Sequence, residues 1–574
     1  MTRPMIRKLV LAAAATTLVV SIAYALSEQT MPTDAAGSCA NSLTPAELNS
    51  WFDAGVVSLN GAVSPANSVL FPDVPNCSFY KWSEQMFLWL TSPAPPRYGG
   101  GGGLIMNSPA FYDVTPPDAN GGRQFVPHSR GFLRVFTLRA SQKGPLDLPV
   151  IQEKRTLRIL EILPTVMSRE RRQMVADQNG NQVEIGRAFR TESGKPVLLD
   201  LSGREIREPR AILQPEFARK IELLKFFDKS ELIQQITLDD KSIVSLNLFG
   251  SFPETEQGQA DGRVLMAQNG SLVYYALTVN NVFALYRTMQ GGSVPPGTKF
   301  PVTQADLDAI TDFAALNGQP PVIDPEALAI EIKTSWIEAS SLDDPSQFLQ
   351  MKAVVPTYNT SDPNDWVQNG TKTATLAMVG MHVVGSTKGH PEMLWATFEH
   401  LSNGPTEAYD YSKKPSGTGH VAANAPGDWL FASNGSTGPF NEPHMAPLDT
   451  VPGHLVSVSP FTISPSDTRR EMPWGLNGTG STAGGNAQVI SINHTVRSLL
   501  DPADVRRNYI HIGTTWTKSG VDPHDPDVIN PQVGTNKLAN TTMETYSQGI
   551  NCFECHFTNT TGVSHIFDST DPLF

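Results

Sequence analysis

Residues 375–384, TLAMVGMHVV, and residues 393–400, MLWATFEH, are the two apolar runs that decide the fold of this chain. Short runs of this kind, rich in β-branched and aromatic side chains, predict strands with a buried face. A third run, residues 330–339 (IEIKTSWIEA), precedes them and predicts another strand. These three segments indicate a β-rich body in the second half of the chain.

Strand signals also dominate residues 104–300. The runs FLRVFTLR (132–139) and TLRILEIL (156–163) are bounded by turn-forming residues. Asn-Gly pairs at 179–180 and 269–270 lie between apolar segments, and this dipeptide is the one that type I′ hairpin turns prefer. Two hairpins are therefore expected in this region.

Helix signals are fewer and shorter. Thr44 and Glu47 form a capping box with a proline at the first helical position, and residues 79–90 (FYKWSEQMFLWL) are amphipathic. Further helices are expected to begin at Pro215 and to span residues 303–316.

The predicted fold class is α+β and β-rich, with an irregular multi-strand body, short N-terminal helices and a loop-rich C-terminal region. Residues 401–490 are rich in Gly and Pro, and loops of this extent usually wrap a functional site. The expected organisation is a signal peptide (1–25), a helical segment with a Gly-rich loop (26–103), a β-rich region (104–300), an α+β region (301–400) and a loop-rich, His-rich region (401–574).

The first 25 residues are typical of a secretory signal. Arg3, Arg7 and Lys8 precede an apolar run that ends at Ala23-Tyr24-Ala25, which predicts cleavage after Ala25; the alternative is an uncleaved membrane anchor. The whole chain has 574 residues and a formal charge of −13, which argues against nucleic acid as a partner. We expect an exported protein, periplasmic or beyond, that is not an integral membrane protein once the signal is removed.

The motif that carries chemistry is Cys552-Phe-Glu-Cys555-His556. A CxxCH sequence is typical of covalent c-type haem attachment, in which two thiols bind the porphyrin and the following imidazole binds the iron. Three alternatives remain open: a disulfide within the motif, a zinc site, and a thioredoxin-like redox pair. Because only one CxxCH is present, the prediction is one covalent haem c held by Cys552, Cys555 and His556. The loop-rich, His-rich region 401–574 is therefore expected to be the haem-attachment and haem-binding region.

The iron's other axial ligand must come from elsewhere in the chain, since only 18 residues follow His556. Of the 12 histidines, His128 alone precedes His382. His382 is the first candidate for the distal ligand because a buried imidazole in an apolar strand needs a polar partner, and a hydrogen-bonded core histidine is the alternative. His400 is the second candidate. Met543, in an expected short helix that ends at Gly549, and His565 follow, and the position could also be open.

Several segments together resemble a group of large bacterial exported proteins usually labelled cytochrome c family, most of whose members are functionally uncharacterised. The similar segments are residues 82–96, 271–280, 375–384, 394–403, 512–516 and 538–548, the last of which leads into the CxxCH motif. The resemblance covers most of the chain beyond the signal. It implies haem attachment at Cys552, Cys555 and His556, and it favours His382 and His400 as ligand candidates.

The expected function is one-electron transfer by an exported mono-haem cytochrome with an unidentified redox partner protein. One alternative is a haem-containing oxidoreductase, because the body is far larger than an electron carrier needs. Another is a β-rich binding protein with an accessory haem. Cys39 and Cys77 are expected to form a disulfide, because the other two cysteines are committed to haem and the compartment is oxidising.

Overall fold

The computed structural model describes most of the chain from residue 31 to residue 574. The described residues are 31–37, 39, 42–72, 76–100, 103–115, 117, 121–128, 133–143, 149–153, 159–164, 166–167, 173–179, 181–190, 196–207, 224–227, 235–237, 243–248, 262–425, 427–448, 453–475 and 482–574. The predicted signal peptide, its cleavage site and the helix expected at Pro215 lie outside these residues.

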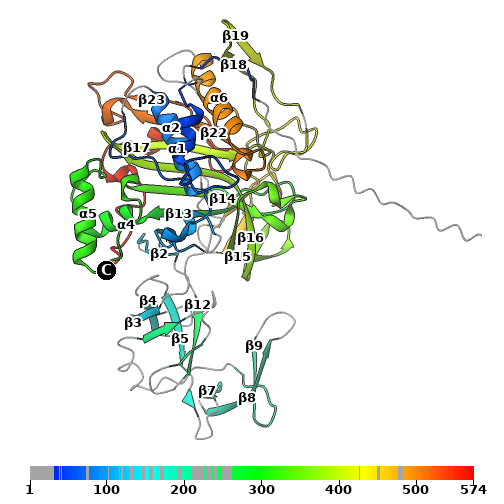
Figure 1. The fold of residues 1–574 in the computed structure, drawn as a ribbon. Helices are drawn as coiled ribbons and strands as arrows, with labels where there is room; N and C mark the ends of the chain where they lie inside the picture. Colours follow the sequence, from blue (N-terminus) through cyan, green and yellow to red (C-terminus); the bar gives the residue numbers. More distant parts are fainter. Residues whose placement is uncertain are drawn as a thin grey trace, which may run out of the picture.

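One antiparallel sheet organises the structure, with strand order β2-β1-β13-β14-β16-β17-β22-β23 (Figure 1). Its strands are β1 (Phe111–Val114), β2 (Phe125–Pro127), β13 (Tyr274–Asn280), β14 (Ile330–Glu338), β16 (Asp365–Thr387), β17 (His390–His400), β22 (Tyr509–Thr517) and β23 (Gln532–Gly534). The three strands predicted from residues 330–339, 375–384 and 393–400 are confirmed as β14, β16 and β17, and they are adjacent in the sheet. The β-rich α+β fold class is confirmed as well.

The 23-residue strand β16 carries two extensions of this sheet. It pairs along its first half with β15 (Gln350–Asp362) and near its start with β21 (His454–Ser457), which in turn pairs with β20 (Met445–Pro447). A separate hairpin joins β18 (Tyr409–Ser412) and β19 (Thr418–Val421).

Between β2 and β13 the chain leaves the main sheet and forms two smaller ones, which lie in the lower part of Figure 1. The first has the order β10-β3-β4-β5-β12-β11 and the second β6-β7-β8-β9. Their strands are β3 (Leu133–Lys143), β4 (Pro149–Glu153), β5 (Ile159–Pro164), β6 (Val166–Met167), β7 (Gln173–Ala176), β8 (Gln182–Arg190), β9 (Pro196–Asp200), β10 (Leu224–Phe227), β11 (Gln235–Thr237) and β12 (Ile243–Leu248). The strands predicted at 132–139 and 156–163 correspond to β3 and β5.

Both predicted hairpins are present, and the turn of the second differs from the predicted type. β7 and β8 pair across Asn179. At Asn269-Gly270, the Gly270 N–H donates to the Ala267 carbonyl, and only Gly270 of the pair has a positive φ, 85°. A type I′ turn needs positive φ at both central residues. This hairpin instead has a turn over residues 267–270 whose last residue, Gly270, has the left-handed backbone conformation. The Asn269 side chain accepts a hydrogen bond from the Ser271 N–H and donates to the Ser341 carbonyl.

The helices cover the sheet and its ends. They are α1 (Pro45–Trp51), α2 (Cys77–Leu90), α4 (Asn281–Met289), α5 (Gln304–Leu316), α6 (Thr482–Leu499) and α7 (Cys552–Cys555), with short 3-10 turns at Pro96–Tyr98, Ile105–Asn107, Pro325–Ala327, Ala339–Ser341, Pro345–Gln347, Val505–Asn508, Lys518–Gly520 and Thr561–Val563. Thr44 caps α1, as its sequence predicts, and the helix predicted over 303–316 is α5, which Thr303 caps. In the described residues, no helix is long and apolar enough to cross a membrane.

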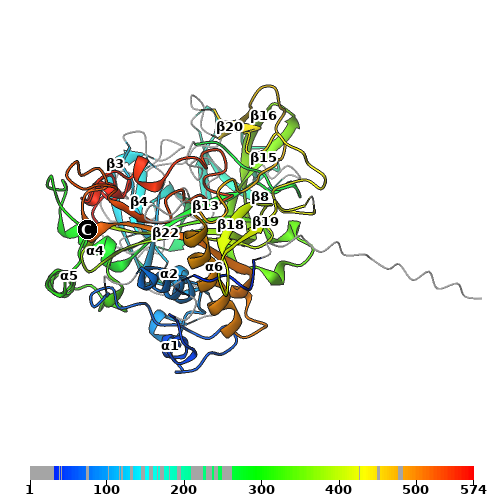
Figure 2. The same cartoon turned by 90° about the horizontal axis from the view of Figure 1, so that it is seen from above.

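The two faces of the main sheet have different coverings. Met381, Val383 and Phe398 pack in one apolar cluster with residues of α2 and α6. Val384 and Trp395 point to the opposite face and pack with residues of the C-terminal segment 538–574. Figure 2 shows α2 and α6 on one side of β22 and the C-terminal segment on the other.

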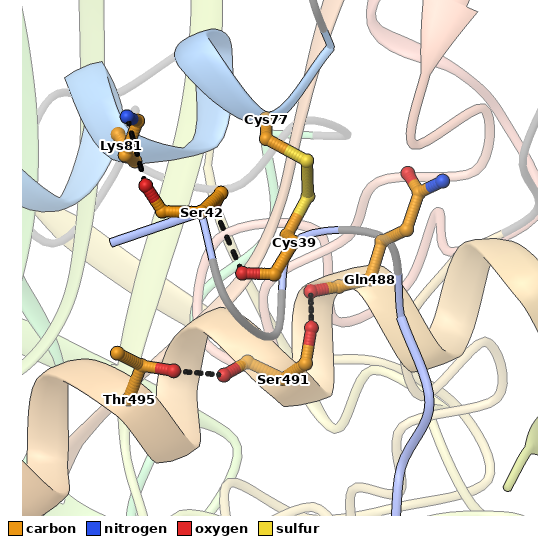
Figure 3. The surroundings of a disulfide bond; sticks show 7 residues. All are labelled: Cys39, Ser42, Cys77, Lys81, Gln488, Ser491 and Thr495. Carbon is orange, nitrogen blue, oxygen red and sulfur yellow. Dashed lines mark hydrogen bonds between the residues drawn. A yellow bond between two sulfur atoms is a disulfide. The ribbon is translucent and has the colours of Figure 1, made fainter. Parts of the chain in front are cut away.

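The predicted disulfide between Cys39 and Cys77 is present, with the two Cα atoms 5.3 Å apart (Figure 3). It joins the N-terminal segment to the first residue of α2, beside α6. Lys81 of α2 donates from Nζ to the Ser42 carbonyl at 3.2 Å, which adds a second contact between the same two segments.

Candidate haem-attachment site

The C-terminal segment 538–574 lies across the sheet face that carries His382 and Trp395. Asn540 donates from its amide to the Phe398 carbonyl (2.9 Å) and to Thr397 Oγ1 (3.0 Å). The Thr541 N–H donates to a carboxylate oxygen of Glu399 at 3.0 Å. These contacts attach the segment to β17 about ten residues before the CxxCH motif.

Gly380, in the middle of β16, permits this close approach. A Cβ atom at Gly380 would lie 2.6 Å from Thr542 Oγ1 and 2.6 Å from Ser335 Oγ, and both contacts are too short for any other residue. The hydroxyls of Thr542 and Ser335 are themselves 2.6 Å apart. The glycine in TLAMVGMHVV therefore allows the C-terminal segment to lie directly on the sheet.

A short helix was expected over 541–549, and this prediction is wrong. The residues form successive turns instead. Thr541 is hydrogen-bonded to Glu399, and Glu544 uses one carboxylate oxygen for the Asn540 N–H and the other for His382. Because these side chains bind the sheet, the segment follows the surface of β17 rather than coiling away from it.

The CxxCH motif begins at α7, a single turn of helix from Cys552 to Cys555. Both cysteines are free thiols, so no disulfide forms within the motif. Cys552 is half-buried and packs at the junction of two apolar clusters, whereas Cys555 is exposed. Burial raises the pKa of the Cys552 thiol well above its ordinary value, and the charge of Glu544 acts in the same direction.

His556 is held in one orientation by three contacts. Its Nδ1 lies 2.7 Å from the Val563 carbonyl oxygen, and its ring packs on Trp395 at a tilt of 36° and stacks on His565, each with a centroid separation of 4.1 Å. Two rings at this separation cannot share one face of an imidazole, so Trp395 and His565 cover opposite faces. Nε2 makes no hydrogen bond with any residue that the structure describes.

The His556 imidazole is neutral at ordinary pH. Burial lowers the pKa of His556 to about 3, and the positive charges of His565, Lys333 and His382 act in the same direction against the hydrogen bond to Val563. A neutral imidazole whose Nδ1–H donates to a backbone carbonyl is the tautomer that presents the Nε2 lone pair to a metal.

His382, the first candidate for the distal ligand, lies on the same sheet face but has both ring nitrogens in hydrogen bonds. Nδ1 is 2.8 Å from Thr397 Oγ1, and Nε2 is 2.9 Å from a carboxylate oxygen of Glu544. The structure thus favours the alternative stated for this residue, a histidine whose polar partners are protein groups.

His400, the second candidate, lies on the opposite sheet face. Its ring stacks on Phe348 at 3.8 Å, Nδ1 bonds Ser402 Oγ, and Nε2 is 3.3 Å from the Gln347 carbonyl. Burial lowers the pKa of His400 to about 3. The structure does not bring His400 to the CxxCH motif.

The two remaining candidates are also engaged. Met543 is fully buried in an apolar cluster with Val379 and Phe431. His565 stacks on the face of His556 and places its Nε2 3.1 Å from the Cys555 carbonyl. A ring stacked on the proximal imidazole lies beside it, not across an iron from it.

The sequence analysis did not single out Glu331 and Lys333 of β14. Lys333 is paired in register with His382, and Glu331 with Val384. Ser564 donates to a Glu331 oxygen at 2.6 Å. The signal for both residues was present in IEIKTSWIEA, where Glu331 and Lys333 alternate with Ile330 and Ile332 and so share one face of a strand.

These ionisable groups have altered proton affinities. Burial raises the pKa of Glu331 to about 7, and burial lowers the pKa of Lys333. For Glu544, burial acts to raise the pKa, but the charges of His382 and Lys333 and the hydrogen bonds from His382 and Asn540 outweigh it and leave the pKa lowered.

The residues present fit a covalently attached haem. Two unbridged thiols sit three positions apart on one helical turn, and the next residue offers a neutral imidazole with only Nε2 unused. This is the donor set that c-type attachment requires. In the described residues, no group of three or more His, Cys, Asp or Glu side chains is arranged to hold a bare metal ion, at the motif or elsewhere.

No family model, no curated protein and no solved structure matches the chain. The site is therefore interpreted from its own geometry.

Proposed function

We propose that this protein is an exported bacterial c-type cytochrome that transfers single electrons through one haem held by Cys552, Cys555 and His556. The observation that carries the proposal is the orientation of His556. A histidine clamped between Trp395 and His565, neutral, and bonded through Nδ1 to the Val563 carbonyl is prepared to bind a metal through Nε2.

Haem at this position would supply a one-electron ferrous/ferric couple. The chain's own residues supply its attachment and surroundings. Cys552 and Cys555 would form the thioether bonds, one from a half-buried and one from an exposed position. The Val563 carbonyl holds a proton on Nδ1, and the aromatic contacts prevent rotation of the ring. The main sheet provides a rigid support, which keeps structural change during electron transfer small.

A second candidate function, a haem-containing oxidoreductase, is favoured by a different observation. Glu331, Lys333, His382 and Glu544 gather on the sheet face that His556 also occupies, and several of their pKa values are shifted. Buried ionisable groups of this kind are more frequent at catalytic sites than in ordinary protein interiors. An enzyme would need an open axial position on the iron, whereas a carrier needs none.

The attachment chemistry can be tested by producing the full chain together with bacterial haem-maturation proteins. We expect one haem per chain that remains bound after denaturation and acidified organic solvent. The double variant Cys552→Ser/Cys555→Ser should lose covalent haem. The matched control is the double variant Cys39→Ser/Cys77→Ser, which replaces the two disulfide-bonded cysteines and should retain covalent haem. Haem-free wild-type protein, or covalent haem in the Cys552/Cys555 variant, would refute the proposal.

The partner and compartment are part of the same proposal. A secretory signal and a disulfide both agree with an oxidising compartment such as the periplasm, where c-type haem is also attached. The expected partner is a redox protein that exchanges electrons with the haem. Fractionation of the native bacterium and stopped-flow reduction by candidate donors would test both expectations.

A further inference from the structure

The side chain of Lys333 stands out on the sheet face that binds the C-terminal segment. It projects from the middle of β14, paired in register with Leu277 on one side and His382 on the other. A lysine at the centre of a sheet loses hydration and is costly unless its amine has a partner. Lys333 is half-buried, and its amine makes no hydrogen bond or ion pair with any residue in the described part of the chain.

The acidic neighbours of Lys333 are already engaged by other groups. Glu331 accepts a hydrogen bond from Ser564 at 2.6 Å. Glu544 accepts from the Asn540 N–H at 2.8 Å and contacts His382 Nε2 at 2.9 Å. Both carboxylates act on Lys333 only through longer-range electrostatics. The lysine is thus the one member of this cluster without a contact partner among the described residues.

The register of the sheet places Lys333 on the side of His556. Lys333, His382 and Thr397 form one cross-strand row, and Glu331, Val384 and Trp395 form the next row on the same face. His556 stacks on Trp395, and Ser564 bonds Glu331.

The other nitrogen and sulfur donors considered for the iron are occupied elsewhere. His382 uses both ring nitrogens, and His400 faces the other side of the sheet. Met543 is in the apolar core, and His565 is stacked on His556. A neutral amine is a good iron ligand, and lysine reaches that form more readily where burial disfavours its charge.

We propose that the amine of Lys333 is the second axial ligand of the iron that His556 binds. This inference rests on the proposed haem attachment and adds the identity of the distal ligand. On coordination, the ammonium group releases one proton to solvent, and the nitrogen lone pair forms the bond to iron. No electron is exchanged in this step. The iron would then be six-coordinate and low-spin, as suits a carrier.

The test uses the full, haem-loaded chain and two substitutions of one residue. Lys333→Ala removes the amine, and Lys333→Arg keeps a positive charge but cannot supply a lone pair, because arginine stays protonated. We expect both variants to keep covalent haem, to lose the low-spin spectrum and to bind carbon monoxide rapidly when reduced. Methylamine added to Lys333→Ala should restore the low-spin spectrum, which a misfolded variant could not show. Lys372→Ala, at an exposed lysine that pairs with Glu338 on the same sheet, is the matched control and should behave as wild type.

Three results would overturn the inference while leaving haem attachment intact. These are a high-spin wild-type protein, a low-spin spectrum retained in Lys333→Ala or Lys333→Arg, and loss of the low-spin spectrum in His382→Ala with rescue by imidazole. If Lys333→Arg keeps the low-spin spectrum and Lys333→Ala loses it, Lys333 acts on the haem only through its positive charge and is not a ligand. Absence of covalent haem in the wild type, seen by haem staining of a denaturing gel, would instead refute the proposed function on which the inference rests.

Discussion

Ser564 donates a hydrogen bond of 2.6 Å to a carboxylate oxygen of Glu331, and this contact joins the loop after the CxxCH motif to the middle of the main sheet. The residue before Ser564 is Val563, whose carbonyl accepts from His556. The residue after it is His565, which covers one face of the same imidazole. One buried carboxylate therefore helps to place both groups that orient the expected proximal ligand.

Because of the carboxyl group of Glu331, the free energy of unfolding should fall as the pH rises towards 7. Burial raises the pKa of Glu331 from 4.5 to about 7, against the charges of Lys333 and Arg123, so the folded protein holds this proton more tightly than the unfolded chain. The resulting stabilisation is complete below pH 4.5 and is lost as the pH rises to about 7, with a magnitude of up to roughly 3 kcal/mol. Glu331→Gln should flatten this dependence in denaturant unfolding, whereas Glu554→Gln, at an exposed position, should not. Parallel pH profiles for wild type and Glu331→Gln would contradict the assignment.

Replacing one partner of the buried ion pair between Arg470 and Glu399 should lower the free energy of unfolding more than replacing both partners would suggest. Both side chains are almost completely buried, and Glu399 also accepts from the Thr541 N–H. Glu399→Gln or Arg470→Met alone leaves an uncompensated charge, with an expected loss of about 3–5 kcal/mol. The double variant should lose much less than the sum of the two single losses. Additive losses in urea unfolding would show that the two side chains are not energetically coupled.

His400 should contribute to acid sensitivity without affecting the haem. Burial lowers the pKa of His400 from 6.5 to about 3, so the unfolded chain binds a proton that the folded protein does not. Stability is full above pH 6.5 and falls as the pH decreases towards 3, by up to about 4–5 kcal/mol. His400→Gln should reduce the slope of stability against pH in this range and leave the visible spectrum unchanged. A changed spectrum would indicate that His400 contacts the iron.

The Cys39–Cys77 disulfide should stabilise the N-terminal segment against α2. The two cysteines are 38 residues apart in the sequence, and closing a loop of this size contributes on the order of 3–4 kcal/mol by restricting the unfolded chain. Cys39→Ser/Cys77→Ser should unfold at a correspondingly lower denaturant concentration. The wild-type chain should resist alkylation at these positions until it is reduced, and labelling of both thiols without reduction would contradict the bridge.

Local patterns in the sequence determined a substantial part of this protein. The strands at 330–339, 375–384 and 393–400, the cap of α1, the helix α5 and the two hairpins follow from side-chain periodicity, capping and turn chemistry that act over a few residues. The disulfide followed from the number of cysteines. By contrast, α6 and β22 were not predicted within the loop-rich region, although β22 is an interior strand. The start of α6, TAGGNAQ, has two glycines that weaken a helix, and its packing against α2 and β22 outweighs that propensity.

Only the tertiary structure decided which histidine could approach the haem motif. His382 and His400 lie on neighbouring antiparallel strands, and the sequence made them the first and second candidates because each lies in an apolar run. The register pairs His382 with Thr397, so those two residues share a face. His400 is three positions beyond Thr397, and because side chains alternate along a strand, that odd interval turns it to the other face, against Phe348. The same register places Lys333 beside His382. Strand register depends on hydrogen bonds and packing between distant segments, and a one-residue shift would reverse every one of these assignments.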